Sequence, residues 1–336
     1  MISVGALLLL FVAYQLWGTG LRTNQAQAKM KDNFEAQVAE VQRSAGVTVA
    51  PTPEPAGGGQ SAAAPAPIPS FSDLAKDPKV REYARNKKYR WGETLGKITI
   101  PKIGVDFWYL EGVELSLLTD GPGHFPSTPF PGQLGNAALA GHRTTWQAPF
   151  NRVDELVPGD KITIETLQGK FTYEVIPQAN GLGSYIVPPT DVSILDNKGD
   201  NRLTLMACHP KYSAAQRIVV SAKLIDNPAE TSPKSDPVDE DELTALPDLD
   251  GVDTVEPAPA STGSGELTAL ASGDDSARVP AMQWAAAAAA IWLAVAVLGH
   301  FYRRVKWPAY VVALPLFGFC LWHCFELINR ALPAAY

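Results

Sequence analysis

Cysteine is scarce in this chain, which has three in 336 residues. Three thiols cannot form the multi-bridge framework of a small disulfide-rich domain. Cys320 and Cys324 lie inside an apolar segment, so Cys208 is the only cysteine outside the hydrophobic runs. Cys208 has no obvious disulfide partner, and its presence needs another explanation.

An excess of basic charge is also lacking, because the formal net charge is −7. Residues 226–280 contain fourteen Asp and Glu against Lys234 and Arg278, a local net charge of −12, so the remainder carries +5. This composition predicts a disordered, self-repelling linker at 226–280. The rest of the chain has no basic stripe that would indicate a nucleic-acid partner.

Charges are absent from the N-terminal apolar run at 2–17. The run is about long enough to cross a bilayer. No small-x-small cleavage site follows it cleanly, which favours an uncleaved anchor over a signal peptide. We therefore predict an N-terminal transmembrane anchor within residues 1–20, although no Lys or Arg precedes it.

Two further apolar runs, 281–300 and 308–328, predict a pair of transmembrane helices within residues 281–329, followed by a short tail at 330–336. The loop between the two runs is basic, with Arg303, Arg304 and Lys306. Short basic loops stay on the cytoplasmic side of a membrane.

This topology places the chain before residue 281 outside the cell, where thiols oxidise. A free Cys208 in that compartment is a liability unless the protein uses it. The sequence thus predicts three transmembrane helices and a functional extracytoplasmic thiol.

Residues 21–70 combine a polar, helix-permissive part at 22–44 with a Pro, Ala and Gly-rich part at 45–70. The second part has the composition of a disordered spacer. A basic segment at 79–90 is predicted to be helical.

The domain predicted at 71–225 consists mainly of short apolar runs separated by Gly and Pro turns. The runs are 97–100, 105–110, 136–140, 161–166, 171–176, 203–208 and 218–225. Many short strands with little helix indicate an all-β fold, either a closed barrel or a sandwich.

Cys208 ends one of these runs, in the stretch Thr-Leu-Met-Ala-Cys-His-Pro at 204–210, and Arg217 begins the next. Two strands joined by a loop would hold a thiol at a rim with a guanidinium beside it. A thiolate attacks carbonyl groups well, provided that a neighbour takes its proton. A fixed cation would stabilise the oxyanion that forms.

A histidine is the natural base, and two candidates lie in the domain away from Cys208. His124 lies in a turn-rich loop, whereas His142 ends a strand and could project over a rim. His209 adjoins Cys208, so it points to the opposite face of the strand. Arg143, beside His142, is expected to point away from the site. These residues alone leave the catalytic and the structural roles of a single histidine open.

The motifs Ala-Gly-His-Arg at 140–143, Thr-Leu-Met-Ala-Cys-His-Pro at 204–210 and Arg217 resemble the sortases in order and spacing. Ile-Pro-Lys-Ile at 100–103 and Gly-Pro-Gly-His at 121–124 support the resemblance, which covers about residues 94–225. It is closest to the actinobacterial housekeeping type, class E. Ala207 departs from the Thr that usually precedes the family's cysteine.

The resemblance implies a closed eight-stranded β-barrel with short helices, and a cysteine transpeptidase. Cys208 would cleave a Leu-Pro-x-Thr-Gly or Leu-Ala-x-Thr-Gly sorting signal between Thr and Gly. His142 would act as acid and base, and Arg217 would stabilise the oxyanion. Neither a metal nor a cofactor enters this chemistry.

The implied partners are secreted surface proteins with a sorting motif, and an amino group of a peptidoglycan precursor. The implied location is the cell membrane, with an extracytoplasmic catalytic domain. Three alternatives compete with this function. An L,D-transpeptidase would carry a Ser-x-Gly-Cys loop, whereas Cys208 follows Met206 and Ala207, and a pilin-polymerising sortase would carry an Asp-Pro-aromatic lid, to which Asp77-Pro78-Lys79 corresponds only loosely. The third alternative is a non-catalytic, membrane-tethered barrel that binds a peptide.

Overall fold

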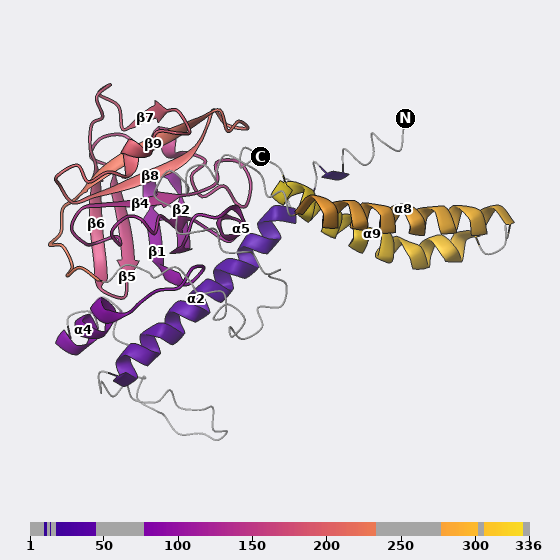
Figure 1. Cartoon of the computed structure of the whole chain (residues 1–336), viewed down its shortest axis with the longest axis horizontal. Helices are drawn as coiled ribbons and strands as arrows, with labels where there is room; N and C mark the ends of the chain where they lie inside the picture. Colours follow the sequence, from indigo (N-terminus) through magenta and orange to yellow (C-terminus); the bar gives the residue numbers. More distant parts are fainter. Residues whose placement is uncertain are drawn as a thin grey trace, which may run out of the picture.

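The structure is a computed structural model, and it describes residues 10, 11, 14, 18–44, 77–232, 277–301 and 306–331. A β-barrel lies beside a long antiparallel helix pair, α8 (Arg278–Phe301) and α9 (Lys306–Ala331). Helix α2 (Thr19–Ser44) runs along the barrel from the base of that pair (Figure 1).

Eight strands close the barrel in the order β6-β5-β1-β2-β3-β4-β8-β9, and β6 pairs with β9 to complete the ring. A ninth strand, β7 (Ser184–Val187), pairs with another part of β9. The other strands are β1 (Thr94–Ile100), β2 (Val105–Glu111), β3 (Gly123–His124), β4 (Asn136–Ala140), β5 (Lys161–Thr166), β6 (Gly169–Val175), β8 (Arg202–His209) and β9 (Gln216–Leu224). The predicted closed eight-stranded barrel is confirmed, and β7 lies outside every predicted run.

The helices of the barrel domain are short. Helix α4 (Pro78–Asn86) overlaps the predicted helical segment 79–90 but begins one residue earlier and ends four residues earlier. The Asp77 side chain accepts a hydrogen bond from the Lys79 backbone N–H at the first turn of this helix. The remaining short helices are α5 (Leu115–Leu118) and the 3₁₀ turns η2 (Pro101–Ile103), η3 (Val153–Glu155) and η4 (Val192–Leu195).

Strand β8 is buried on both faces. Leu203, Leu205 and Ala207 belong to the main core inside the barrel, whereas Met206 belongs to a second apolar cluster, which also contains Val187 of β7. Because successive strand residues point to opposite faces, Cys208 lies on the same face as Met206. The thiol therefore lies on the outer wall of the barrel, under the second cluster, and not in the main core.

Helix α2 packs on the barrel and is part of the same body. Strand β3 pairs with β2 only at Leu110 and Glu111, which leaves the preceding edge of β2 without a strand partner on that side. The Gln27 amide covers this edge: it donates to the Trp108 carbonyl at 2.9 Å and accepts from the Trp108 N–H at 2.7 Å. The segment 22–44, predicted only as polar and helix-permissive, thus completes the barrel wall.

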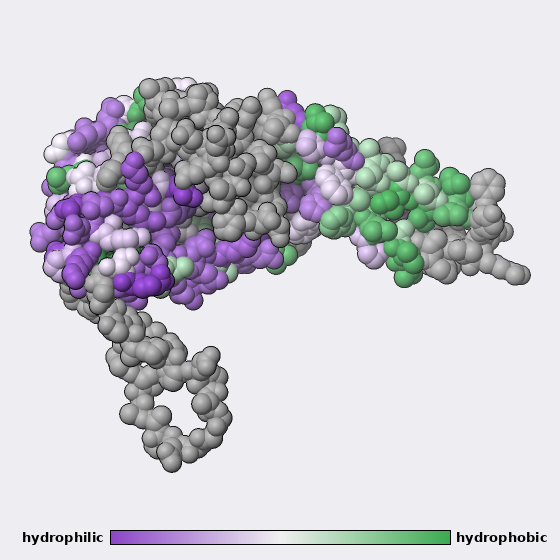
Figure 2. All heavy atoms as spheres, turned by 60° about the horizontal axis from the view of Figure 1, so that its bottom comes forward, coloured by the Kyte–Doolittle hydropathy of each residue, from purple (hydrophilic) through white to green (hydrophobic). Residues whose placement is uncertain are grey.

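Helices α8 and α9 contain the apolar stretches Arg278–Leu298 and Val311–Ile328, which are long and apolar enough to cross a membrane. Hydrophobic residues gather along this helix pair, whereas the barrel and α2 are mainly hydrophilic (Figure 2). The prediction of three spans is corrected to two within the described part of the chain. The predicted anchor at 1–20 and the predicted linker at 45–70 fall largely or wholly outside the described residues. Of the predicted disordered linker at 226–280, residues 233–276 also lie outside them, whereas the described residues 226–232 contact the barrel, where the Ala229 N–H donates to the Gly132 carbonyl at 2.7 Å.

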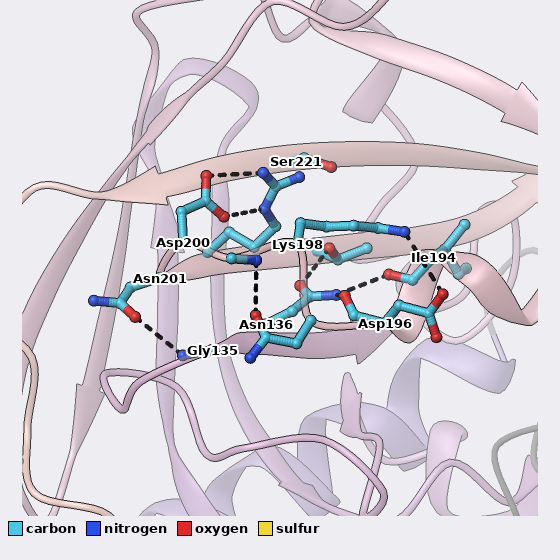
Figure 3. Close-up of polar contacts among 12 residues, drawn as sticks. Gly135, Asn136, Ile194, Asp196, Lys198, Asp200, Asn201 and Ser221 are labelled. Carbon is cyan, nitrogen blue, oxygen red and sulfur yellow. Dashed lines mark hydrogen bonds and ion pairs between the residues drawn. The ribbon is translucent and has the colours of Figure 1, made fainter.

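A polar network fixes the start of β8 to the start of β4 (Figure 3). The Asn136 amide donates to the carbonyls of Ile194 and Asp196 at 2.8 and 3.1 Å, and its oxygen accepts from the Thr204 hydroxyl at 2.7 Å. Asn136 is 1% exposed, so these bonds replace water that cannot enter.

We expect Asn136→Ala to lower the free energy of unfolding by about 1–3 kcal/mol, because it leaves buried carbonyl and hydroxyl groups without partners. Thermal unfolding followed by circular dichroism measures the change. Lys198→Ala, an exposed substitution in the same loop region, is the control and should stay within about 0.5 kcal/mol of wild type. Equal losses in the two variants would contradict a specific role for the buried amide.

Candidate active site

The register of β8 and β9 places Cys208 directly opposite Arg217. Opposed residues of an antiparallel pair carry their side chains on the same face, close together. Both side chains line a narrow pocket on the outer wall of the barrel, together with Leu118, Ala140, Gly141, His142, Met206 and Ala207. The three predicted site residues therefore meet in one pocket, although 75 positions of sequence separate the most distant two.

His142 follows β4 by two residues and reaches the pocket from the strand next to β8. It is 6% exposed, and its Nε2 atom is buried with no hydrogen-bond partner within the described residues. Burial lowers the pKa of His142 from 6.5 to about 4. The imidazole is therefore neutral at pH 7 and can accept a proton.

Burial also raises the pKa of the Cys208 thiol, and the nearby Arg217 and Arg143 partly offset this effect. The thiol is 8% exposed. Thiol and imidazole thus both rest in their neutral forms, because desolvation penalises each charged form.

Arg217 is 2% exposed, yet it is charged at any ordinary pH. Its Nη1 atom donates to the carbonyls of Ala214 and Gln216 at 2.8 and 3.0 Å. These bonds to the loop before β9 fix the guanidinium in place beside Cys208. A fixed, desolvated cation is the kind of group that stabilises a developing negative charge.

Arg143 lies closer to Cys208 than the sequence predicted. Its Nη1 atom donates to the Cys208 carbonyl at 3.1 Å, while Nη2 pairs with Asp154 at 2.9 Å and Nε donates to the Asn151 carbonyl at 3.1 Å. Arg143 does not line the pocket, in agreement with the prediction that its side chain points away from the site. Arg143 instead holds the backbone of Cys208, a contact that strand alternation does not reveal.

The other two histidines of the domain lie away from the pocket. His124 is fully buried: its Nδ1 lies 2.6 Å from a Glu111 oxygen and its Nε2 lies 3.0 Å from the Pro129 carbonyl. Both ring nitrogens are occupied, so His124 is a structural residue. His209 contacts Arg143 through Nδ1 at 3.4 Å, as expected for the face opposite Cys208.

Within the described ranges, no group of three or more His, Cys, Asp or Glu side chains is arranged to hold a metal ion. The polar contents of the pocket are one thiol, one imidazole and one guanidinium. Such a set can perform nucleophilic acyl transfer, in which the thiol attacks, the imidazole moves the proton and the guanidinium faces the oxyanion.

This combination of a β-barrel and a Cys, His and Arg pocket defines a class of cysteine acyl-transfer proteins. A family model described as Sortase domain matches residues 98–225. Sortase D of Bacillus subtilis is 31% identical over 151 residues, which are 43% of this chain and 72% of that protein. The chain belongs to the sortase family, whose members are cysteine transpeptidases.

Other relatives span several types of sortase. Sortase SrtE1 of Streptomyces coelicolor is 26% identical over 253 residues, which are 70% of this chain and 58% of that protein, so the match spans little more than half of its length. Among solved structures, sortase E from Streptomyces avermitilis is 31% identical with a TM-score of 0.36, covering 41% of this chain and 91% of that one. SrtF sortase from Corynebacterium diphtheriae is 29% identical with a TM-score of 0.40, covering 43% and 90%.

We expect acid to destabilise the barrel through His142. The pKa of this imidazole is about 4 in the folded chain and 6.5 when it is fully hydrated, so below pH 6.5 the unfolded chain binds a proton that the folded chain does not. The contribution of the neutral imidazole to stability is therefore present above pH 6.5 and is lost as the pH falls towards 4. The free energy of unfolding of wild type and of His142→Gln, measured between pH 6.5 and 4, tests this contribution. The variant should lose less stability than wild type as the pH falls. Parallel pH profiles for the two proteins would contradict the buried, neutral imidazole.

Proposed function

We propose that this chain is a membrane-anchored sortase that cleaves a sorting signal of the Leu-Pro-x-Thr-Gly or Leu-Ala-x-Thr-Gly type between Thr and Gly. It then joins the surface protein to an amino group of a peptidoglycan precursor. The observation that carries the proposal is the meeting of Cys208, His142 and Arg217 in one desolvated pocket.

In the first half of the reaction, the Cys208 sulfur attacks the threonine carbonyl carbon and its proton passes to His142. Arg217 stabilises the negative charge on the carbonyl oxygen. His142 then protonates the glycine nitrogen as the peptide bond breaks, which leaves a thioester on Cys208. Because the Cys208 thiol and the His142 imidazole are both neutral at rest, the reactive pair of Cys208 thiolate and His142 imidazolium forms only as a minor population.

In the second half, His142 takes a proton from the incoming amine, which attacks the thioester carbon. The thiolate leaves and recovers a proton from the imidazole. Every group that moves a proton is thereby returned to its starting state. Arg217 stabilises the oxyanion of this second step as it stabilises that of the first.

The helix pair supports one membrane arrangement. The barrel lies at the end of the pair where α8 begins and α9 finishes (Figure 1). In the sequence, Arg303, Arg304 and Lys306 lie between the two apolar runs. Short basic loops stay in the cytoplasm, so the barrel and its pocket would face outward at the membrane surface. We further propose that residues 1–20 anchor the chain at the membrane, and that 45–70 and the part of the predicted 226–280 linker beyond residue 232 serve as linkers.

The test is turnover of a fluorogenic sorting peptide by the full-length chain in phospholipid nanodiscs, with hydroxylamine as the acceptor amine. Wild type should release the fluorophore and form the hydroxamate, whereas Cys208→Ala and His142→Ala should have no detectable turnover. Arg217→Ala should lose about 10²-fold in kcat/KM, the usual loss for one oxyanion contact.

Cys320→Ala is the matched control, because Cys320 lies in α9 and outside the pocket. It should keep wild-type turnover. Equal peptide binding by all variants with turnover by none would replace the enzyme with a peptide-binding barrel. Formation of peptide polymers through a lysine of a second substrate would favour the pilin-polymerising alternative.

A further inference from the structure

The loop that follows His142 has an unusual backbone. Trp146, Gln147 and Ala148 have positive φ angles of 54°, 59° and 44°, and none of them is glycine. The left-handed region is disfavoured for residues with a Cβ atom, and three in succession persist only where surrounding contacts hold them. Contacts from neighbouring segments must therefore hold residues 146–148 in this conformation, only a few residues after His142.

The first turns of α2 supply them. The Gln147 side-chain amide donates to the Gly20 carbonyl at 3.1 Å and to the Asn24 side-chain oxygen at 2.6 Å. The Arg22 guanidinium lies 5.9 Å from the ring centre of Trp146, which is 3% exposed. Two of the three left-handed residues thus contact α2.

The same turns also contact the segment that carries Leu118, another residue of the pocket lining. Leu118 lines the pocket, and the two residues after it contact α2 through their backbone carbonyls. The Thr23 hydroxyl donates to the Thr119 carbonyl at 2.9 Å, and the Gln27 amide donates to the Asp120 carbonyl at 2.8 Å. One short stretch of helix therefore contacts the segments that carry both His142 and Leu118.

This stretch also touches the membrane helix pair. Arg22 forms an ion pair with Glu326 of α9 and lies 3.6 Å from a carboxylate oxygen of Asp120. A few residues earlier in the chain, the ring of Tyr14 packs edge-on against Trp322 of α9, with 5.0 Å between the ring centres. Arg22 is thus shared between the membrane helix pair and the two segments that border the pocket.

We propose that residues 19–27 of α2 are a positioning element for the active site, in which Arg22 and Asn24, together with Gln147 of the contacted loop, are the positioning residues. They hold the loop after His142 in its strained conformation, and Arg22 connects that loop to α9. None of them touches the pocket itself. The inference rests on the proposed function for its kinetic consequence, whereas its structural consequence is independent of any substrate.

The kinetic experiment compares the full-length chain in nanodiscs with Arg22→Gln, Asn24→Ala and Gln147→Ala. A misplaced catalytic group lowers the rate of the chemical step, so we expect kcat to fall about tenfold or more, with KM within about twofold. Arg22→Lys keeps the charge and should recover part of kcat. Lys31→Gln, which removes an exposed α2 ion pair away from the pocket, is the matched control and should match wild type. A wild-type kcat in all three test variants would overturn the inference.

Hydrogen exchange tests the inference without turnover. Backbone amides at 142–150 should exchange faster in the three test variants than in wild type and Lys31→Gln, while strands β5 and β6 keep their protection. Unchanged protection of 142–150 would overturn the inference. If wild type turns over no peptide, the proposed function fails, and this exchange measurement alone decides the role of residues 19–27.

Discussion

The pairing of β8 with β9 is the constraint on which the candidate site depends. It sets Cys208 opposite Arg217 and Met206 opposite Val219, on the outer face of the barrel wall. A shift of one residue would turn the Cys208 side chain into the main core and away from the face that Arg217 shares. The register is held because Leu203, Leu205 and Ala207 fill the barrel interior on the other face. Core packing thus decides which way the nucleophile points.

Desolvation sets the chemistry of the pocket. The same burial that keeps the Cys208 thiol protonated also keeps the His142 imidazole neutral, although two arginines lie near the sulfur. A charged cation is tolerated there because the Arg217 guanidinium donates to backbone carbonyls, which offset part of its lost hydration. The pocket therefore holds a neutral acid–base pair beside a permanent positive charge. This arrangement favours a state in which negative charge appears on a substrate oxygen and not on the resting sulfur.

Helix α2 links the barrel to the apolar helix pair. Helix α2 closes an open edge of β2 through Gln27, contacts both sides of the pocket, and meets α9 through Arg22. The barrel is consequently held against the near end of the α8–α9 pair by contacts within the described residues (Figure 1). The same helix therefore fixes the barrel relative to this pair and contacts the segments that border the pocket.

The sequence by itself determined the elements whose signal is local. Alternating apolar runs and Gly or Pro turns predict the barrel strands, and long apolar runs predict α8 and α9. The resemblance of the motifs around His142, Cys208 and Arg217 to the sortases predicts the candidate site. Only the tertiary structure decided the ninth strand β7, the contact of Arg143 with the Cys208 carbonyl, and the docking of α2. Strand β7 depends on backbone pairing with β9, and the other two features depend on hydrogen bonds between side chains and backbone groups distant along the chain. Such bonds leave no periodic pattern in the sequence, because any polar residue on a helix is equally compatible with solvent until the fold brings a backbone partner to it.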